Sequence, residues 1–137
     1  MADIVRKIAY FAMDVPNKAG EGARVLRALA DANVNLLAFS GFPSGRKAQL
    51  DIIPEDVTLF KIAAKAAKIK TRTQKFGFLI QGDDRAGAVA ELLHKLSEMK
   101  INVTAIDAVS AGAGRYAAIL WVEGRNVNKA AKALGAV

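Results

Sequence analysis

The stretch KAGEGARVLRALADANVNLLAF (Lys18–Phe39) returns 67 residues later as RAGAVAELLHKLSEMKINVTAI (Arg85–Ile106). In this alignment Gly20 falls on Gly87, and the apolar side chains that follow recur in both copies at intervals of three and four residues. That interval predicts an amphipathic helix. Self-similarity at a fixed period indicates that one supersecondary unit occurs twice. We therefore expect two copies of the same small fold.

The residues around the two predicted helices extend the repeat outward. A short apolar segment precedes each helix, a polar turn leads into it, and two further strand-like segments and a second helix follow it. The first segments are Ile8–Met13 and Phe76–Ile80, and the turns are Asp14–Gly20 and Gly82–Gly87. The later strands are Val34–Phe42 with Ala48–Ile53, and Ile101–Val109 with Tyr116–Val122; the second helices follow Asp56 and Asn126.

This order predicts an α+β fold made of ferredoxin-like βαββαβ units in tandem, with antiparallel sheets and helices on one face. We expect the first unit to span residues 1–73 and the second to span residues 74–137. The first unit has room for a last strand around Ile69–Thr73, whereas the second has little chain left for a fourth strand after Leu134. That strand is either missing or supplied by another segment.

Composition excludes several classes of protein. The 137 residues include no cysteine, which excludes disulfides, thiolate metal sites and thiol catalysis. No apolar run approaches the roughly 18 residues of a membrane span, and the start MADIVRK has no apolar signal-peptide core. We expect a cytoplasmic protein that does not enter a membrane.

Positive charge is concentrated in one segment. The net charge is +7, and the segment Lys61–Lys75 holds six basic residues and no acidic one. Lys61, Lys65 and Lys68 are spaced to share one helix face. A solvated helix face is the simpler interpretation, and a surface for an anionic partner, including nucleic acid, is the alternative.

The repeated residues resemble the ACT domain family. That family has a strand, an Asp-x-Pro-Gly-like turn, a helix and a strand that starts with Val/Ile-Asn-Ile/Leu/Val. This chain carries Asp14–Gly20 followed by Val34-Asn35-Leu36, and Asp83–Gly87 followed by Ile101-Asn102-Val103. The resemblance covers nearly the whole chain, and it implies a regulatory module that binds an amino acid at an interface between paired domains.

The resemblance also implies which residues hold the ligand. These are the turn before the first helix and the start of the second strand in each copy. In the first copy they are Asn17, Lys18, Ala19, Gly20, Glu21 and Asn35; in the second they are Asp84, Arg85, Ala86, Gly87, Ala88 and Asn102.

Elementary chemistry suits those positions to an amino acid. A helix N-terminus offers unpaired N–H groups and a partial positive charge to a carboxylate. Gly20 and Gly87 allow close approach to the backbone there, and carboxylates in the turn suit an ammonium group. Asn35 and Asn102 offer both a donor and an acceptor. We expect each glycine-opened helix end to face the asparagine at the start of the next strand.

We therefore expect a non-catalytic regulatory protein whose ligand is a small molecule, an amino acid. The partners expected are further copies of the chain, as a homodimer or larger homo-oligomer, and a separate enzyme subunit. A ligand-free assembly module for an amino-acid metabolic enzyme is the second interpretation, and a nucleic-acid binder that uses the Lys61–Lys75 face is the third and less favoured one. No catalytic residue, metal ligand or cofactor is expected, because no nucleophile has a base in pattern and His94 is the only histidine.

Overall fold

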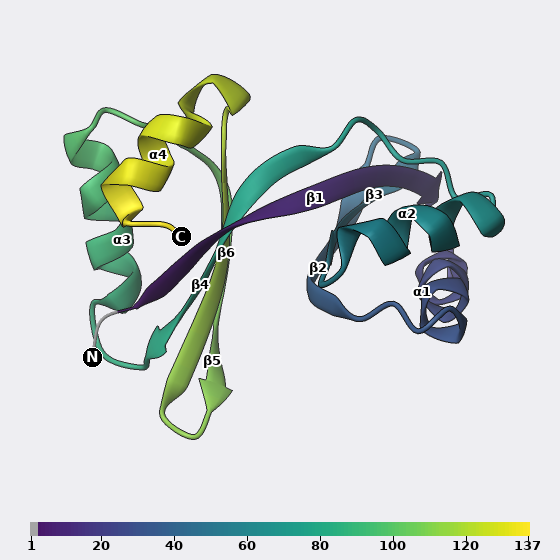
Figure 1. Ribbon diagram of the computed structural model, residues 1–137, viewed down its shortest axis with the longest axis horizontal. Helices are drawn as coiled ribbons and strands as arrows, with labels where there is room; N and C mark the ends of the chain where they lie inside the picture. The colour runs from purple at the N-terminus through teal and green to yellow at the C-terminus, as the bar shows by residue number, and fades with distance from the viewer. Residues whose placement is uncertain (1–2) are drawn as a thin grey trace. The chain divides into compact units, whose positions relative to one another are not determined.

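Strand β1 (Ile4–Pro16) is shared between two units of the computed structural model, which describes residues 3–137 (Figure 1). The continuous unit comprises Ala9–Lys75. Among the described residues, the split unit comprises 3–8 together with Phe76–Val137. The compact units therefore differ from the expected division 1–73 and 74–137, because the first part of β1 clusters with the second half of the sequence.

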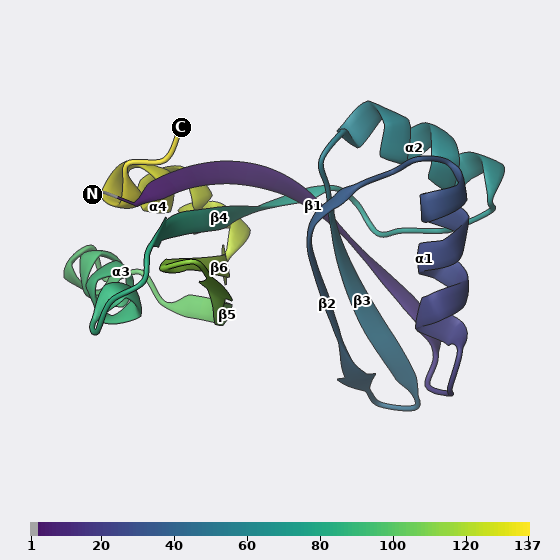
Figure 2. The same ribbon diagram turned by 90° about the horizontal axis from the view of Figure 1, so that it is seen from below.

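The continuous unit contains the second part of β1 and four further elements. Its strand order is β2-β3-β1, and both pairs are antiparallel. Helices α1 and α2 lie on the same face of these strands (Figure 2). The bounds are α1 (Glu21–Asp31), β2 (Leu36–Ser44), β3 (Lys47–Pro54) and α2 (Val57–Ala66).

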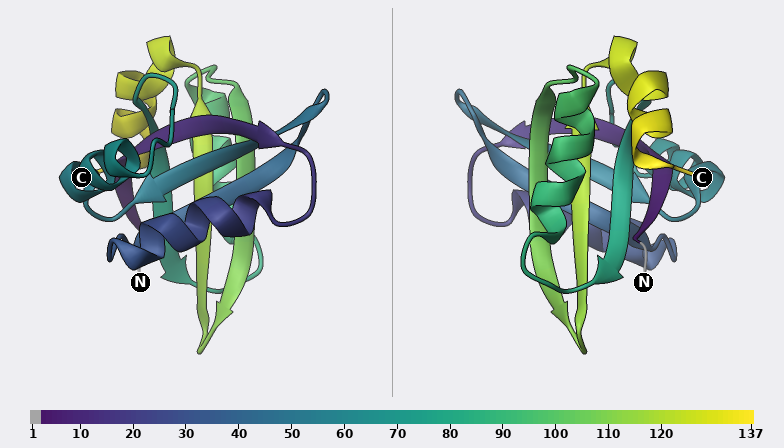
Figure 3. Two further views of the ribbon diagram at one scale, coloured as in Figure 1. Left: turned by 90° about the vertical axis from the view of Figure 1, so that its right-hand side faces the viewer. Right: turned by 90° about the vertical axis from the view of Figure 1, so that its left-hand side faces the viewer.

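The split unit contains the first part of β1 and the remaining elements. Its strand order is β1-β4-β6-β5, and β6 is antiparallel to both β4 and β5. Helices α3 and α4 cover one face of this sheet (Figure 3). The bounds are β4 (Lys75–Asp83), α3 (Ala88–Glu98), β5 (Val103–Gly112), β6 (Arg115–Val122), a 3₁₀ turn (Gly124–Asn126) and α4 (Val127–Leu134).

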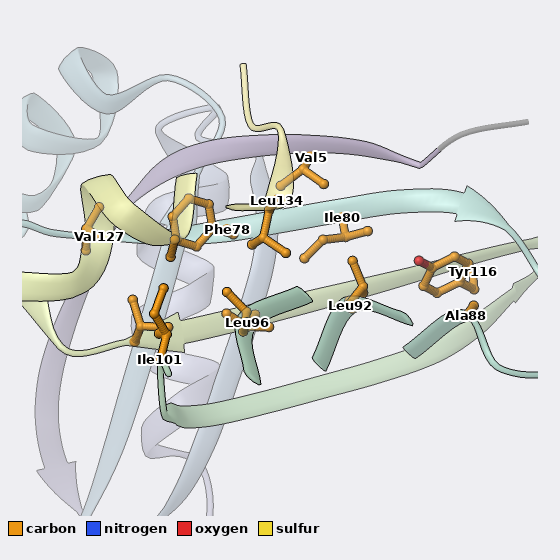
Figure 4. Packing of buried hydrophobic residues seen from close by; sticks show 14 residues of the cluster. Val5, Phe78, Ile80, Ala88, Leu92, Leu96, Ile101, Tyr116, Val127 and Leu134 are labelled. Atoms are coloured by element: carbon orange, nitrogen blue, oxygen red, sulfur yellow. The ribbon is translucent and has the colours of Figure 1, made fainter. Parts of the chain in front are cut away.

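The start of β1 is the fourth strand that the second half of the sequence lacks. Val5 belongs to the buried core of the split unit, together with Phe78 and Ile80 of β4 (Figure 4). The other edge of this part of β1 is paired with the last residue, because the N–H of Val137 donates to the carbonyl of Val5 over 2.9 Å. Burial of the apolar side chains on β1, β4 and α3 is the main force that holds these segments together.

The last strand expected around Ile69–Thr73 is not formed. Residues 69–74 have no regular secondary structure. They follow β1 through a single backbone bond from the N–H of Arg72 to the carbonyl of Ala12, over 2.8 Å, and through the ion pair of Arg72 with Asp14. A strand would require a ladder of backbone hydrogen bonds, and the segment forms only this one with β1. The continuous unit therefore has no fourth strand at this edge.

The helices resemble one another in the backbone conformation that follows them but differ in the group that caps their N-terminal ends. Just beyond each of the four helices of residues 3–137 stands a residue with a left-handed backbone. It is Asn33 after α1, Lys68 after α2, Lys100 after α3 and Gly135 after α4, with φ of 57° to 68°. At their N-terminal ends the helices differ. The side chain of Asp56 caps α2 by accepting a hydrogen bond from the N–H of Leu59, whereas the N-caps of α1 and α3 are glycines, which have no side chain to accept one.

None of the helices formed by residues 3–137 is long and apolar enough to cross a bilayer.

Candidate functional site

The candidate site lies at the N-terminal end of α3. Gly87 occupies the N-cap with φ of +86°, a conformation that glycine adopts without steric cost. Because glycine has no side chain to cap the helix, the N–H groups of Val89 and Ala90 in the first turn have no acceptor among residues 3–137. Two free amides at the positive end of the helix dipole form a site of attraction for a carboxylate.

A hollow of about 360 Å³ lies in front of these amides. The turn after β4 and the first turn of α3 form one side of it, and β5 forms the other. The residues that line the hollow are Asp84, Arg85, Gly87, Ala88, Val89, Ala90, Ala108, Val109, Ser110 and Tyr116. The volume falls within the range of small-molecule sites.

Asp84 and Ser110 place polar groups at the mouth of the hollow. The hydroxyl of Ser110 donates to Oδ2 of Asp84 over 3.1 Å, and both residues are exposed. The N–H of Asp84 donates to the carbonyl of Gly114 over 2.9 Å, which ties the turn to the β5–β6 hairpin. A carboxylate is thus held beside a pair of free amides, an arrangement with one site for a cation and one for an anion. We call the group formed by Asp84, Gly87, Val89, Ala90 and Ser110 the α3 pole.

Arg85 is held by groups of the protein itself. Its guanidinium donates to Oε2 of Glu91 over 2.8 Å, to Oδ1 of Asp3 over 3.2 Å and to the carbonyl of Asp83 over 2.9 Å. The bonds to Glu91 and Asp3 raise the pKa of Arg85. These bonds tie the turn to α3 and to the start of the chain, and the expected role of Arg85 in ligand binding stays a prediction.

Tyr116 completes this network under the hollow. Its hydroxyl donates to Oδ2 of Asp3 over 2.8 Å, and the side chain of Asp3 is only 10% exposed. Burial, followed by the bond to Asp3, raises the pKa of Tyr116 to about 12. Close by, the bond from Arg115 over 2.8 Å holds the pKa of Asp83 below its usual range.

The two asparagines do not lie at the glycine-opened helix ends of their own units. Asn35 follows the C-terminal end of α1, whereas Gly20 caps its N-terminal end, and 11 helical residues separate them. At 1.5 Å per residue that distance is about 16 Å. The side chain of Asn35 donates instead to Oε2 of Glu55 over 3.3 Å. Asn102 and Gly87 stand at opposite ends of α3 in the same way, so the expectation that amide and glycine face one another within a copy is wrong.

No protein-family model matches the chain, and a comparison with curated proteins found no match in sequence. Solved structures do match it. Protein BT0572 from Bacteroides thetaiotaomicron is similar with a TM-score of 0.79 and 20% identity, over 97% of this chain and 88% of that one. The regulatory subunit of aspartate kinase from Thermus thermophilus, in its ligand-free form, is similar with a TM-score of 0.66 and 15% identity, over 98% and 95% of the two chains.

A third similarity is to a larger protein. Aspartokinase III from E. coli, in complex with aspartate and ADP, matches with a TM-score of 0.55 and 16% identity, over 97% of this chain and 32% of that one. This chain has the fold of an aspartate kinase regulatory subunit. At such identities the likeness concerns the fold alone, and it confirms the expected α+β class with ferredoxin-like, ACT-like units.

The helix end of the first ACT-like unit is less well equipped than the α3 pole. Gly20 has φ of +91° and caps α1 without a side-chain bond, as Gly87 does at α3. At the 67-residue offset, however, Asn17 stands in place of Asp84, and Pro43 stands in place of Ser110. Glu21 is engaged by Arg24 over 3.2 Å. The exposed residues at this end are Asn17, Lys18, Ala19 and Gly20.

The hollow is also lined by residues that the sequence did not single out for binding. Ala108, Val109 and Ser110 come from the far end of β5, and Tyr116 comes from β6. Asp84, Arg85, Gly87 and Ala88 were expected and do line the hollow, whereas Ala86 does not stand among its lining residues. The signal that could have found Ser110 is strand register, because Ser110 pairs with Tyr116 of β6 and Tyr116 pairs with Gly82 of β4, just before the turn that leads into α3.

Proposed function

We propose that the chain is a non-catalytic regulatory protein that binds an amino acid at the α3 pole. The ligand's carboxylate accepts the N–H groups of Val89 and Ala90, and its ammonium group donates to Asp84. Its side chain lies over Ala108 and Val109. The observation that carries this proposal is the free pair of amides beside an exposed carboxylate in one hollow.

The charges of a zwitterion complement the two halves of the pole. A carboxylate at a helix N-terminus gains about 0.3–1 kcal/mol, and up to about 2 kcal/mol where it is partly buried. A hydrogen bond between an ammonium group and a carboxylate contributes about 1.5–3 kcal/mol. A simple anion would use only the amides and would be repelled by Asp84, so the pole favours a molecule that carries both charges.

The structural neighbours support a regulatory role and an enzyme partner. One is the regulatory subunit of an aspartate kinase, and another is an aspartokinase whose structure contains aspartate. By analogy, the partner of this chain is an enzyme of amino-acid metabolism on a separate polypeptide. A ligand that binds one arrangement of the pair more tightly than the other would then shift the enzyme's activity.

A homodimer is part of this proposal, and the edge of the split unit supports it. Strand β5 is the outermost strand of its sheet, and its residues are mostly exposed. Val109, which lines the hollow, is 64% exposed. A second copy paired antiparallel at this edge would complete the free strand, cover Val109 and bring the start of its own β5, next to Asn102, toward the pole.

Titration calorimetry with the twenty amino acids tests the proposal. We expect at least one of them to bind, and its N-acetylated form to bind much more weakly, because acetylation removes the ammonium charge. Asp84→Asn keeps an acceptor for Ser110 but removes the negative charge, so we expect binding about 10- to 100-fold weaker. Asn17→Ala, at the corresponding place in the first unit, is the matched control and leaves binding unchanged.

Two results would refute the amino-acid site. One is the absence of binding for all twenty at millimolar concentration, and the other is unchanged affinity in Asp84→Asn. If the chain then co-purified with an enzyme subunit regardless of added amino acid, an assembly module would be the better description.

A further inference from the structure

A second hollow lies in the continuous unit, beside the C-terminal half of α2. Its volume is about 500 Å³. The floor is apolar, because Phe11 and Phe60 stack beneath it with ring centroids 4.8 Å apart and Ile69 forms a wall. Four lysines surround it: Lys61, Lys65, Lys68 and Lys70. We call this feature the lysine hollow.

The four lysines are not neutralised by the protein. The sequence from Val57 to Gly82 contains no aspartate or glutamate. None of the ion pairs formed between residues 3 and 137 involves any of the four, whereas Arg24, Arg72, Arg85 and Arg115 each have a carboxylate partner. The positive charge around the hollow is therefore available to a ligand.

Assembling these lysines costs the protein stability. Like charges three or four residues apart on a helix destabilise it by a few tenths of a kcal/mol for each pair. Lys68 also has φ of +58°, a left-handed conformation that costs a residue with a side chain about 1–2 kcal/mol. A helix C-terminus gains from a cation, which explains Lys65 in the last turn of α2. It does not explain Lys61 in mid-helix or Lys70 beyond the helix.

We propose that the lysine hollow binds a small polyanion, a phosphorylated metabolite with two or more negative charges and a compact apolar or planar part. The charges of the ligand lie among the ammonium groups at the rim. The apolar part lies over the floor and along the hydrocarbon stems of the lysines. This site belongs to a different unit from the α3 pole, and it does not depend on the amino-acid proposal.

The geometry disfavours a polynucleotide as the ligand. Binding of single-stranded nucleic acid relies on exposed aromatic faces along a basic groove. Here Phe11 and Phe60 are stacked on each other in a single hollow, and no other aromatic side chain of residues 3–137 lines it, so successive bases of a strand find no row of faces. The segment Lys61–Lys75 also accounts for six of the seven excess positive charges, which leaves little basic surface beyond it for a long polyanion. A ligand confined to one hollow fits this distribution better.

Calorimetry with three probes tests the inference on the full chain: ATP, tripolyphosphate and adenosine. We expect ATP to bind more tightly than tripolyphosphate, because the floor adds apolar contact, and adenosine not to bind. The variant K61Q/K65Q/K68Q/K70Q should bind ATP about 10- to 100-fold more weakly, and replacement of the same lysines by arginine should preserve binding.

The control variant K95Q/K100Q/K129Q/K132Q also loses four charges. All four of its positions are exposed and lie outside the hollow, and Lys100 has the same left-handed backbone as Lys68. We expect it to bind ATP as the unmodified chain does. The double variant K61Q/K65Q, with about half the loss in charge, keeps the test valid if the quadruple variant does not fold.

Several outcomes would overturn the inference. Equal losses in the two quadruple variants would indicate unspecific attraction, and the absence of any binding of ATP and tripolyphosphate would remove the site. Equal affinity for those two probes would exclude a role for the apolar floor. Tighter binding of a single-stranded oligonucleotide than of ATP, lost in the hollow variant alone, would replace the metabolite by nucleic acid.

Discussion

The residues beneath the α3 pole form a connected polar network. Asp3 accepts from both Tyr116 and Arg85, and Arg85 also donates to Glu91. The network requires a glycine, because a methyl group at Gly82 would overlap the carboxylate of Asp3. Buried polar groups are costly unless they are paired, so the partners of Asp3 hold the start of the chain and the pole in one arrangement.

Tyr116→Phe tests this network. The substitution removes the hydroxyl and leaves Oδ2 of Asp3 without that donor, which should lower the free energy of unfolding by about 1–3 kcal/mol. Urea denaturation measures the change. In a double-mutant cycle with Asp3→Asn, the two losses should not add, because both substitutions remove the same bond. Additive losses would show that the hydroxyl and the carboxylate act independently.

The pKa of Tyr116 gives the same network a pH signature. An ordinary tyrosine has a pKa of 10.0, and that of Tyr116 is raised to about 12 by burial and by its bond to Asp3. The fold thus favours the neutral hydroxyl, so the stability contributed is fully present below pH 10 and is lost as the pH rises towards 12. Tyr116→Phe should therefore weaken the dependence of stability on pH in that interval.

At the scale of the element, the two repeated helices are opened by glycine for a conformational reason. Gly20 and Gly87 have φ of +91° and +86°, and a Cβ atom at either position would have open space around it. Steric crowding therefore does not require glycine at these positions; the backbone conformation does. The absence of a capping side chain leaves the first amides of the helix free, which is the property that the proposed site uses.

Gly87→Ala and Gly22→Ala should change stability in opposite directions. Alanine at Gly87 must adopt a left-handed backbone, which should cost about 1 kcal/mol without any clash. Gly22 lies within α1, also in open space, and alanine there should stabilise the protein by about 0.5 kcal/mol through helix propensity. Thermal denaturation of both variants measures the two changes in stability. A loss of stability of similar size in both would mean that the left-handed backbone at Gly87 is not what makes glycine necessary there.

The elements that periodicity predicted are present, because amphipathic spacing is a local property. Both helices of each copy and the strands between them follow from apolar side chains every two or every three to four residues. The expected pairing of glycine with asparagine failed for a reason that also lies in the sequence. The repeat aligns equivalent residues but contains no distances, and the length of α1 sets Asn35 about 16 Å from Gly20.

At the scale of the whole molecule, strand sharing was beyond the reach of local pattern. The 13 residues of β1 are twice the usual strand length, and only the structure shows that their first part belongs to the split unit. Pairing between β1 and β4, which are separated in the sequence by the elements from α1 to α2, leaves no periodic signal in either segment. The sequence could identify Asp84 as part of a turn, but placing Ser110 beside it also requires the register of β4, β6 and β5, which the strand-like pattern alone does not give.

Two fragments of the chain test whether the boundary after residue 73 separates two units that fold independently. We expect the fragment 9–75 to fold cooperatively, because it retains its sheet β2-β3-β1, both helices and its own buried core. The fragment 74–137 lacks the start of β1, so the face of β4 that Val5 covers and the edge that pairs with β1 are exposed to water. A domain of this size is only marginally stable with its core intact, and the loss of a strand should leave it unfolded. Circular dichroism and thermal denaturation of the two fragments measure this difference.

A permuted fragment provides the decisive control. Val137 pairs with β1 at Val5 and Lys7, so a short Gly/Ser linker can join the C-terminus of 74–137 to residues 3–8. This chain should recover a cooperative transition, and Val5→Asp within it should abolish the transition, because the new carboxylate would be buried among Phe78 and Ile80 without a partner. Cooperative folding of 74–137 alone would show instead that the start of β1 is an addition to a unit already complete.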